Sequence, residues 1–492
     1  MRRLTVLKWL AGLLLLQCLA YATPSTGLQP CRVEGMPNEL LCGSVSRPLD
    51  PDRPDGVRID VHYLVVPAMA RNKQADPVVM LVGGPGQSAI SVAPAVLNRL
   101  GRLNNRRDLV FIDQRGTGRS APLQCDDDSH LSLAQSMDMA AQLARLQTCK
   151  EKLSKLPYGD MRFFTTTIAM QDFDAVRKAL GATQWNLIGG SYGTRAALEY
   201  LRQFPDHVRR TVLDGVAPPD QVLPISMSAD TQTALDAEFS ACEKEVACRR
   251  LYPALRAQWD GLLKGLPRAV VVRHPVTGVS EQIVFTRGAA LRAVRAPLYG
   301  PVSTSALPEA IHAASQGRFD AMVGLASALG SSSRALRLAT GMHFSVVCAE
   351  DMPRLPVSKD KTGADYGAMD VALYSQVCAR WPLGKVPEQF YEVRPARSPV
   401  LILSGGADPV TPPRHANRVA QQLGSQVQHV VVPEAGHGVM ALGCMRDVVF
   451  KFIDTKEDAA ALSQEASCAT RIPRPGVFVP VQAASASQGV KP

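Results

Sequence analysis

Ser191 lies in the sequence Gly-Gly-Ser-Tyr-Gly at residues 189–193, which is a G-x-S-x-G pattern. A short apolar run at 185–188 precedes it, and the composition of 194–200 favours a helix. A serine between a strand and a helix forms the sharp turn called a nucleophile elbow, which exposes the hydroxyl. The N-terminus of the helix would direct N–H groups at the oxyanion formed by attack on a carbonyl. The pattern therefore predicts that Ser191 is a catalytic nucleophile.

A nucleophilic serine needs a histidine as general base and a carboxylate that orients this histidine. Asp408 follows an apolar run at 399–404, and His437 lies between two glycines after another run at 428–432. Loops after parallel strands meet at one edge of a sheet, and the order serine, acid, histidine is typical of this kind of triad. We therefore expect Asp408 and His437 to complete a triad with Ser191.

Two other aspartates compete with Asp408 for the role of the acid. Asp214 also ends a predicted strand and could reach the histidine. Asp113 is a weaker alternative, because its neighbour Arg115 suggests a structural ion pair that holds the turn.

An oxyanion hole requires two N–H donors that point at the developing negative charge. Tyr192, directly after the nucleophile, is expected to provide one of them. The second is expected from the Gly-Gly-Pro-Gly run at 83–86, which follows a predicted buried strand. Proline has no N–H, so the expected donor is Gly84. The run lacks the Lys-Ser/Thr ending of a phosphate-binding loop, and it could also be an ordinary turn.

Strand and helix signals alternate along the chain, which is typical of an α/β protein with a mainly parallel sheet. The strand signals fade between residues 221 and 397, where Ala, Leu, Met and Ser predominate and the composition favours helices, and they resume afterwards. The predicted fold is an α/β-hydrolase core interrupted by a mainly helical lid domain. The predicted segments are a signal peptide (1–22), a first core part (23–220), the lid (221–397), a second core part (398–470) and a disordered tail (471–492).

The first residues are typical of a secretory signal peptide. A basic start is followed by a short apolar core and by Ala-Tyr-Ala at 20–22, a suitable cleavage site. No other stretch approaches the length of about 20 apolar residues needed to span a membrane. The net charge of +10 is spread along the chain, which argues against a nucleic-acid partner. We therefore expect an exported protein, periplasmic or secreted, without stable membrane insertion; its oligomeric state is left open.

Ten of the eleven cysteines lie beyond the predicted signal peptide, and an even number in an exported chain indicates disulfides. Sequence alone does not fix their connectivity, but they fall into neighbouring pairs: Cys31–Cys42, Cys125–Cys149, Cys242–Cys248, Cys348–Cys378 and Cys444–Cys468. Cysteine and histidine spacings typical of zinc ligands do not occur. Neither a metal nor another cofactor is expected.

The motifs at 83–86, 113–120 and 189–193 together resemble the prolyl-aminopeptidase/tripeptidyl-aminopeptidase family of α/β-hydrolases. The segment 213–216 and the cysteine-bearing C-terminal part resemble its secreted, tripeptidyl-aminopeptidase-like branch. The resemblance implies a serine aminopeptidase that releases short peptides or N-terminal residues from substrates with a free N-terminus. Val82 and Gln87 depart from the residues common in the family, and both are expected near the substrate.

The same resemblance implies that carboxylates of the lid bind the ammonium group of the substrate. Glu350 and Asp351 are the first candidates because they follow Cys348 closely; Glu238, Glu243, Glu245 and Glu309 are further ones. A carboxylesterase or lipase-like enzyme is the main alternative, because one fold supports both reactions. A catalytically inactive binding protein is a third hypothesis, and the presence of all three triad residues argues against it.

Overall fold

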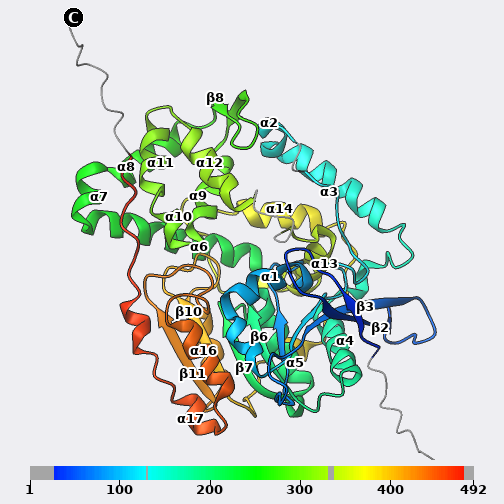
Figure 1. Ribbon diagram of the computed structural model, residues 1–492. Helices are drawn as coiled ribbons and strands as arrows, with labels where there is room; N and C mark the ends of the chain where they lie inside the picture. Colours follow the sequence, from blue (N-terminus) through cyan, green and yellow to red (C-terminus); the bar gives the residue numbers. More distant parts are fainter. Residues whose placement is uncertain (1–26, 129–130, 331–336, 481–492) are drawn as a thin grey trace, which may run out of the picture.

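The computed structural model describes residues 27–128, 131–330 and 337–480 (Figure 1). The predicted signal peptide therefore lies outside the described residues. Within them, no helix is both long and apolar enough to cross a membrane.

A nine-stranded sheet forms the centre of the core, in the order β1-β2-β3-β5-β4-β6-β7-β10-β11. The pairs from β1 to β5 are antiparallel, and all pairs from β5 through β4 to β11 are parallel. The strands are β1 (Gln29–Cys31), β2 (Leu40–Pro48), β3 (Arg58–Val66), β4 (Val78–Leu81), β5 (Leu109–Ile112), β6 (Trp185–Gly190), β7 (Val208–Asp214), β10 (Val400–Gly405) and β11 (Val427–Val432). The predicted α/β fold with a mostly parallel sheet is confirmed.

Helices cover both faces of this sheet, so its central strands are buried on both sides and carry continuous apolar runs. Alternate residues of β4 point to opposite faces: Val79 joins one apolar cluster and Met80 the other. The cluster of Val79 includes residues of α4 (Thr166–Ala179), α5 (Tyr192–Gln203) and α15 (Pro413–Leu423). The cluster of Met80 includes residues of α1 (Ala89–Leu100), α16 (Met445–Asp454) and α17 (Asp458–Leu462).

The chain between β7 and β10 forms a layer of helices above the carboxyl ends of the parallel strands (Figure 1). Its helices are α6 (Leu223–Lys244), α7 (Val246–Leu251), α8 (Leu255–Lys264), α9 (Arg287–Leu298), α10 (Pro301–Thr304), α11 (Leu307–Ser315), α12 (Asp320–Gly330), α13 (Thr340–Glu350) and α14 (Met369–Cys378). Most of them share a core around Trp259, Phe285 and Phe319. We refer to residues 221–397 as the lid.

Two features of this layer differ from a purely helical insertion. A hairpin of β8 (Arg268–Arg273) and β9 (Ser280–Phe285) lies at its outer end. In addition, α2 (Leu133–Met137) and α3 (Met139–Leu153), from the first core part, extend into the same layer, where Leu133 donates its N–H to Glu281 on β9. Short 3-10 helices complete the described elements: Gly101–Asn105, Met161–Phe163, Pro205–His207, Met352–Val357, Glu388–Tyr391 and Ser467–Arg471.

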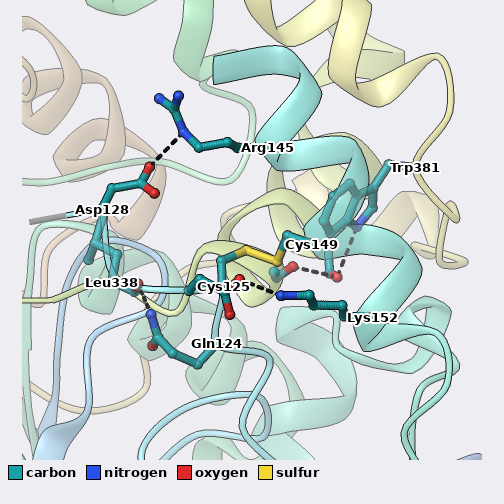
Figure 2. The surroundings of a disulfide bond; sticks show 11 residues. Gln124, Cys125, Asp128, Arg145, Cys149, Lys152, Leu338 and Trp381 are labelled. Atoms are coloured by element: carbon teal, nitrogen blue, oxygen red, sulfur yellow. Dashed lines mark hydrogen bonds and ion pairs between the residues drawn. A yellow bond between two sulfur atoms is a disulfide. The ribbon is translucent and has the colours of Figure 1, made fainter. Parts of the chain in front are cut away.

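Within the described residues, five disulfides join the neighbouring pairs 31–42, 125–149, 242–248, 348–378 and 444–468. The Cys348–Cys378 bond ties the end of α13 to the end of α14. Figure 2 shows the Cys125–Cys149 bond, which holds the loop before α2 against α3. Next to it, Gln124 donates a hydrogen bond to the carbonyl of Leu338, just before α13.

The last described residues, up to 480, belong to the segment 471–492 that the sequence predicts as a disordered tail, and they contact the lid. Residues 467–471 form a 3-10 helix, and the chain then runs along the lid as far as residue 480. Arg474 pairs with Glu238 on α6, and Phe478 donates its N–H to the carbonyl of Ser305. The proline-rich sequence of this segment carries no pattern that would predict these contacts with distant parts of the chain. Residues 481–492 lie outside the described part.

Candidate active site

Ser191 stands at the turn between β6 and α5, in a backbone conformation that is rare for a residue with a side chain. Its φ is 56° and its ψ is −127°, and such strain is typical of a nucleophile elbow. The flanking glycines are required sterically, because a Cβ on Gly193 would lie 2.0 Å from the carbonyl oxygen of Leu81. The N–H of Ser191 donates to the carbonyl of Asp214 at 2.9 Å, which fixes the turn to the end of β7.

Asp408 and His437 are in direct contact at the carboxyl ends of β10 and β11. The Nδ1 atom of His437 lies 2.8 Å from Oδ2 of Asp408. Asp408 is buried and also accepts hydrogen bonds from the N–H groups of Val410 and Thr411 and from the hydroxyl of Thr411. The acidic partner fixes the histidine with Nε2 available to a substrate or nucleophile, as a general base requires.

The two groups shift each other's pKa in opposite directions. Burial alone would lower the pKa of His437, but the Asp408 carboxylate raises it above the ordinary histidine value. Burial alone would raise the pKa of Asp408, but His437 and the surrounding hydrogen-bond donors hold it below the ordinary aspartate value. Asp408 is therefore ionised near neutral pH and stabilises the imidazolium that forms when His437 accepts a proton.

Asp214, the alternative acid, forms no hydrogen bond or ion pair with the imidazole. Its carboxylate accepts the backbone N–H groups of Val439 and Met440, all at 2.9 Å. Asp214 thus connects the nucleophile turn, through its main chain, to the loop that carries His437, through its side chain. Among the described residues no hydrogen bond joins Ser191 to His437 directly; such bonds are often long before a substrate is bound.

Asp113, the other alternative acid, lies in a structural turn. It accepts hydrogen bonds from the hydroxyl of Ser88 and from the N–H groups of Ile90 and Arg119. The expected ion pair with Arg115 is not formed, because Arg115 binds Asp172 instead, at 2.6 Å.

The Gly-Gly-Pro-Gly loop at 83–86 lies beside the nucleophile. A Cβ on Gly83 would lie 3.1 Å from Cβ of Ser191. The side chain of Gln87 accepts the N–H of Gly83 at 3.1 Å, and Pro85 has no N–H, so Gly84 and Gly86 carry the remaining N–H groups of the Gly-Gly-Pro-Gly run. Gly84 and Tyr192 line the same cavity as Ser191. Gln87, a departure from the family pattern, thus has a local role in shaping this loop.

A cavity of about 290 Å³ opens at Ser191, between the core and the lid. Its wall is mainly apolar and includes Leu223 and Met227 of α6, Val347 of α13 and Tyr374 of α14. Its charged lining consists of Arg195, one turn after Ser191 on α5, and Asp351, at the end of α13. A mostly apolar cavity with a few polar groups is typical of a small-molecule or peptide subsite.

Arg195 forms a buried cluster with the two carboxylates that the family resemblance suggested. Its guanidinium lies 2.8 Å from Asp351 and 3.5 Å from Glu350. Asp351 lines the cavity, whereas Glu350 lies behind it and accepts hydrogen bonds from the N–H and hydroxyl of Thr166. Burial raises the pKa of Glu350 to about 7, although Arg195 and Thr166 act in the opposite direction. The cluster holds two carboxylates and one guanidinium.

The other candidate carboxylates of the lid do not line this cavity. Glu238 pairs with Arg474, and Glu309 accepts a hydrogen bond from the hydroxyl of Tyr252. In the part of the chain that the structure describes, three or more His, Cys, Asp or Glu side chains do not gather to hold a metal ion. Sequence reasoning missed Arg195, Thr411 and the cavity-lining His343. Some of their contacts join residues far apart in the chain, and no sequence motif marks these residues as functional.

Comparison with known proteins agrees with this geometry. Residues 76–239 match the family model described as alpha/beta hydrolase fold, and residues 365–468 match the model described as TAP-like protein. The chain belongs to the TAP-like family of α/β-hydrolases. As a member of this family with a serine at the elbow, it is a serine hydrolase.

Three relatives of this TAP-like hydrolase share 26% of aligned residues with it. Serine protease Hip1 of Mycobacterium tuberculosis aligns over 449 residues, 82% of this chain and 85% of the relative. Tripeptidyl aminopeptidase of Streptomyces lividans aligns over 482 residues, 89% and 86% respectively. Carboxylesterase B of Mycobacterium tuberculosis aligns over 414 residues, 78% of each chain.

Proposed function

We propose that this chain is an exported serine aminopeptidase that cleaves peptides with a free N-terminus through an acyl-enzyme. Ser191 attacks the scissile carbonyl, and His437 takes its proton and later returns it to the leaving amine. Asp408 stabilises the imidazolium, and the N–H groups of Gly84 and Tyr192 bind the oxyanion. Water then attacks the acyl-enzyme in the same way.

The observation that carries the choice of a peptidase is the buried cluster of Arg195, Glu350 and Asp351, of which Asp351 lines the cavity. Arg195 pairs with Asp351 and balances one negative charge. Glu350, whose pKa burial raises to about 7, carries the second charge above that pH, and an ammonium group beside Asp351 would then balance it. A buried ammonium without such a partner would cost several kcal/mol. The apolar lining of the cavity suits an apolar side chain between the amine and the scissile bond. Relatives named as a tripeptidyl aminopeptidase and a serine protease support this function.

The test compares each peptide p-nitroanilide with its N-acetylated form, for one-residue and three-residue acyl groups. We expect acetylation to lower kcat/KM at least a hundredfold, equivalent to about 2.7 kcal/mol of transition-state binding. Asp351→Asn should reduce cleavage of the free amine far more than cleavage of the acetylated form. Glu309→Gln is the matched control, because Glu309 is a lid carboxylate outside the cavity.

A carboxylesterase is the second candidate, because the relative named Carboxylesterase B aligns with 78% of this chain. Rapid hydrolysis of short-chain esters without cleavage of any free-amine peptide would favour it. Equal cleavage of free and acetylated peptides would contradict the aminopeptidase proposal while leaving the serine hydrolase assignment intact.

A further inference from the structure

The carbonyl of Pro85, in the loop that holds Gly84, contacts a histidine of the lid. The Nδ1 atom of His343, on α13, lies 3.2 Å from this carbonyl oxygen. The Nε2 atom on the other side of the ring lies 2.8 Å from the hydroxyl of Tyr374 on α14. His343 also lines the cavity at Ser191. A lid side chain therefore reaches the loop expected to bind the oxyanion.

The partners of His343 determine which nitrogen carries the proton. A carbonyl oxygen only accepts hydrogen bonds, so Nδ1 must be the donor to Pro85. In the neutral ring, Nε2 then accepts a hydrogen bond from the hydroxyl of Tyr374. Burial lowers the pKa of His343, so the neutral form is favoured near neutral pH. The rings of Phe344 and Tyr374, with centroids 5.3 Å and 5.8 Å from that of His343, hold its orientation.

A second bond from the same segment holds the loop next to Pro85. The N–H of Ala339, just before α13, donates to the carbonyl of Gly86 at 2.8 Å. Two consecutive carbonyls of the loop are thus held by α13. That of Pro85 binds His343 in the first turn, and that of Gly86 binds Ala339 just before the helix. Neighbouring Gly84 and Gly86 have φ values of 115° and 114°, so the loop is intrinsically adaptable and requires external contacts to define it.

The helix that carries His343 is itself fixed in place. The Cys348–Cys378 disulfide joins α13 to α14, the helix of Tyr374. The main chain at Gly341 donates to the carbonyl of Leu123, in the loop that the Cys125–Cys149 disulfide holds. A rigid support of this kind is what a preorganised donor in an active site requires.

We propose that His343 is a positioning residue for the oxyanion hole, which orients the loop of Gly84 by donating from Nδ1 to the carbonyl of Pro85. The inference rests on the assignment of Gly84 as an oxyanion donor and is independent of the choice between peptide and ester substrates. The bond affects a group that acts mainly in the transition state, so its loss should lower kcat and leave KM nearly unchanged.

The test uses substitutions that differ in where they place an N–H donor. In His343→Asn the amide nitrogen occupies nearly the position of Nδ1, whereas in His343→Gln it lies closer to that of Nε2. His343→Leu has no donor. We expect His343→Leu and His343→Gln to lower kcat for p-nitrophenyl acetate by about tenfold to a hundredfold, less than the loss of a whole oxyanion donor. His343→Asn should recover most of this loss.

The rate of labelling by a fluorophosphonate should follow the same order, because its phosphoryl oxygen occupies the oxyanion hole. Tyr374→Phe keeps the ring and the Nδ1 donor, so a smaller loss is expected. His312→Leu is the matched control on α11, where His312 contacts Gln258 and Gln316. Thermal unfolding of each variant establishes that it is folded.

Folded His343→Leu with an unchanged kcat would overturn the proposal. So would His343→Asn as slow as His343→Leu, because it would indicate a role in packing rather than donation to Pro85. A wild-type enzyme that reacts with the ester and the probe but cleaves no free-amine peptide would contradict only the aminopeptidase function.

Discussion

Asp214 accepts the backbone N–H of Val439 with both oxygens of its carboxylate, at 2.9 Å each. Val439 lies two residues after His437, so this contact sets the path of the histidine loop. The main-chain carbonyl of Asp214 accepts the N–H of Ser191. One residue at the end of β7 thus fixes the nucleophile and the base relative to each other. Its carboxylate serves a different purpose from that of Asp408, which contacts the imidazole itself.

We predict that Asp408→Asn impairs catalysis far more than Asp214→Asn. An amide at 408 can hold the wrong tautomer of His437, which costs about ten-thousandfold in the analogous serine-protease triad. An amide at 214 keeps one acceptor for the loop but directs an NH₂ group at the other donors, so we expect a loss of about tenfold to a hundredfold. Steady-state kcat/KM for both variants, with Asp236→Asn as a surface control, provides the measurement. The reverse order in folded proteins would make Asp214 the acid.

The acidic limb of the pH profile should report His437. Because Asp408 raises the pKa of His437 above 6.5, the histidine remains protonated, and inactive as a base, up to a higher pH than usual. We expect kcat/KM to decrease as the pH is lowered, with the midpoint of this decrease at a pH above 6.5. Asp214 contributes to the same rise in pKa through its charge, so Asp214→Asn should lower the midpoint. A midpoint that stays fixed or rises in this variant would contradict the electrostatic contribution of Asp214.

The loops that carry the three proposed catalytic residues could be predicted because each follows a recognisable buried strand. The G-x-S-x-G pattern predicts the strand, turn and helix of a nucleophile elbow. The order of the strands then places the loops of Asp408 and His437 at the same edge of the sheet. The distinction between Asp408 and Asp214 could not be predicted, because both end a strand. Only the three-dimensional register shows which carboxylate meets an imidazole and which meets backbone N–H groups.

The lid was less predictable, because its contacts join residues that are far apart in the sequence. Arg195 and Asp351 are 156 positions apart, and no sequence motif predicts that they form an ion pair. The β8–β9 hairpin was missed because its outward-facing side carries exposed valines such as Val271 and Val284, so the usual alternation of polar and apolar residues is weak. Tertiary contacts, rather than local propensity, define these parts of the structure.

Ser191→Ala should abolish both turnover and fluorophosphonate labelling while leaving the fold intact. Loss of the nucleophile removes the acyl-enzyme route, and comparable triads lose about a millionfold in kcat. The measurement requires protein prepared free of wild-type enzyme, with circular dichroism to establish folding. Retained activity above a small fraction of the wild-type value would remove Ser191 from the mechanism.

Removing the Cys348–Cys378 bond by substitution of both residues with serine should destabilise the protein by about 3–4 kcal/mol, from the chain entropy of a loop of this length. The residues are 30 positions apart, whereas Cys242 and Cys248 are separated by only 6. The same double substitution at 242 and 248 is therefore the matched control, and its cost should be about 1 kcal/mol smaller. Urea unfolding compares the two variants. A larger loss at 242 and 248 would contradict the loop-length argument.

Arg474 should hold the C-terminal segment against the lid by neutralising a buried carboxylate. It pairs with Glu238, whose side chain is 5% exposed, and its other nitrogen lies 3.9 Å from Glu434, three residues before His437. Burial already raises the pKa of Glu238 despite Arg474. In Arg474→Ala the unpaired carboxylate should cost about 1–3 kcal/mol of stability at pH 8.

This cost should shrink as the pH falls towards 5. Without Arg474 the folded-state pKa of Glu238 rises further above its unfolded value, so the folded state takes up a proton first and is stabilised relative to the unfolded state at lower pH. Urea unfolding of wild type and Arg474→Ala at both pH values measures the difference. The double variant Glu238→Gln/Arg474→Ala should remove the pH dependence, and Arg471→Ala provides an exposed control nearby. An equal loss at pH 5 and pH 8 would show that Arg474 contributes packing alone.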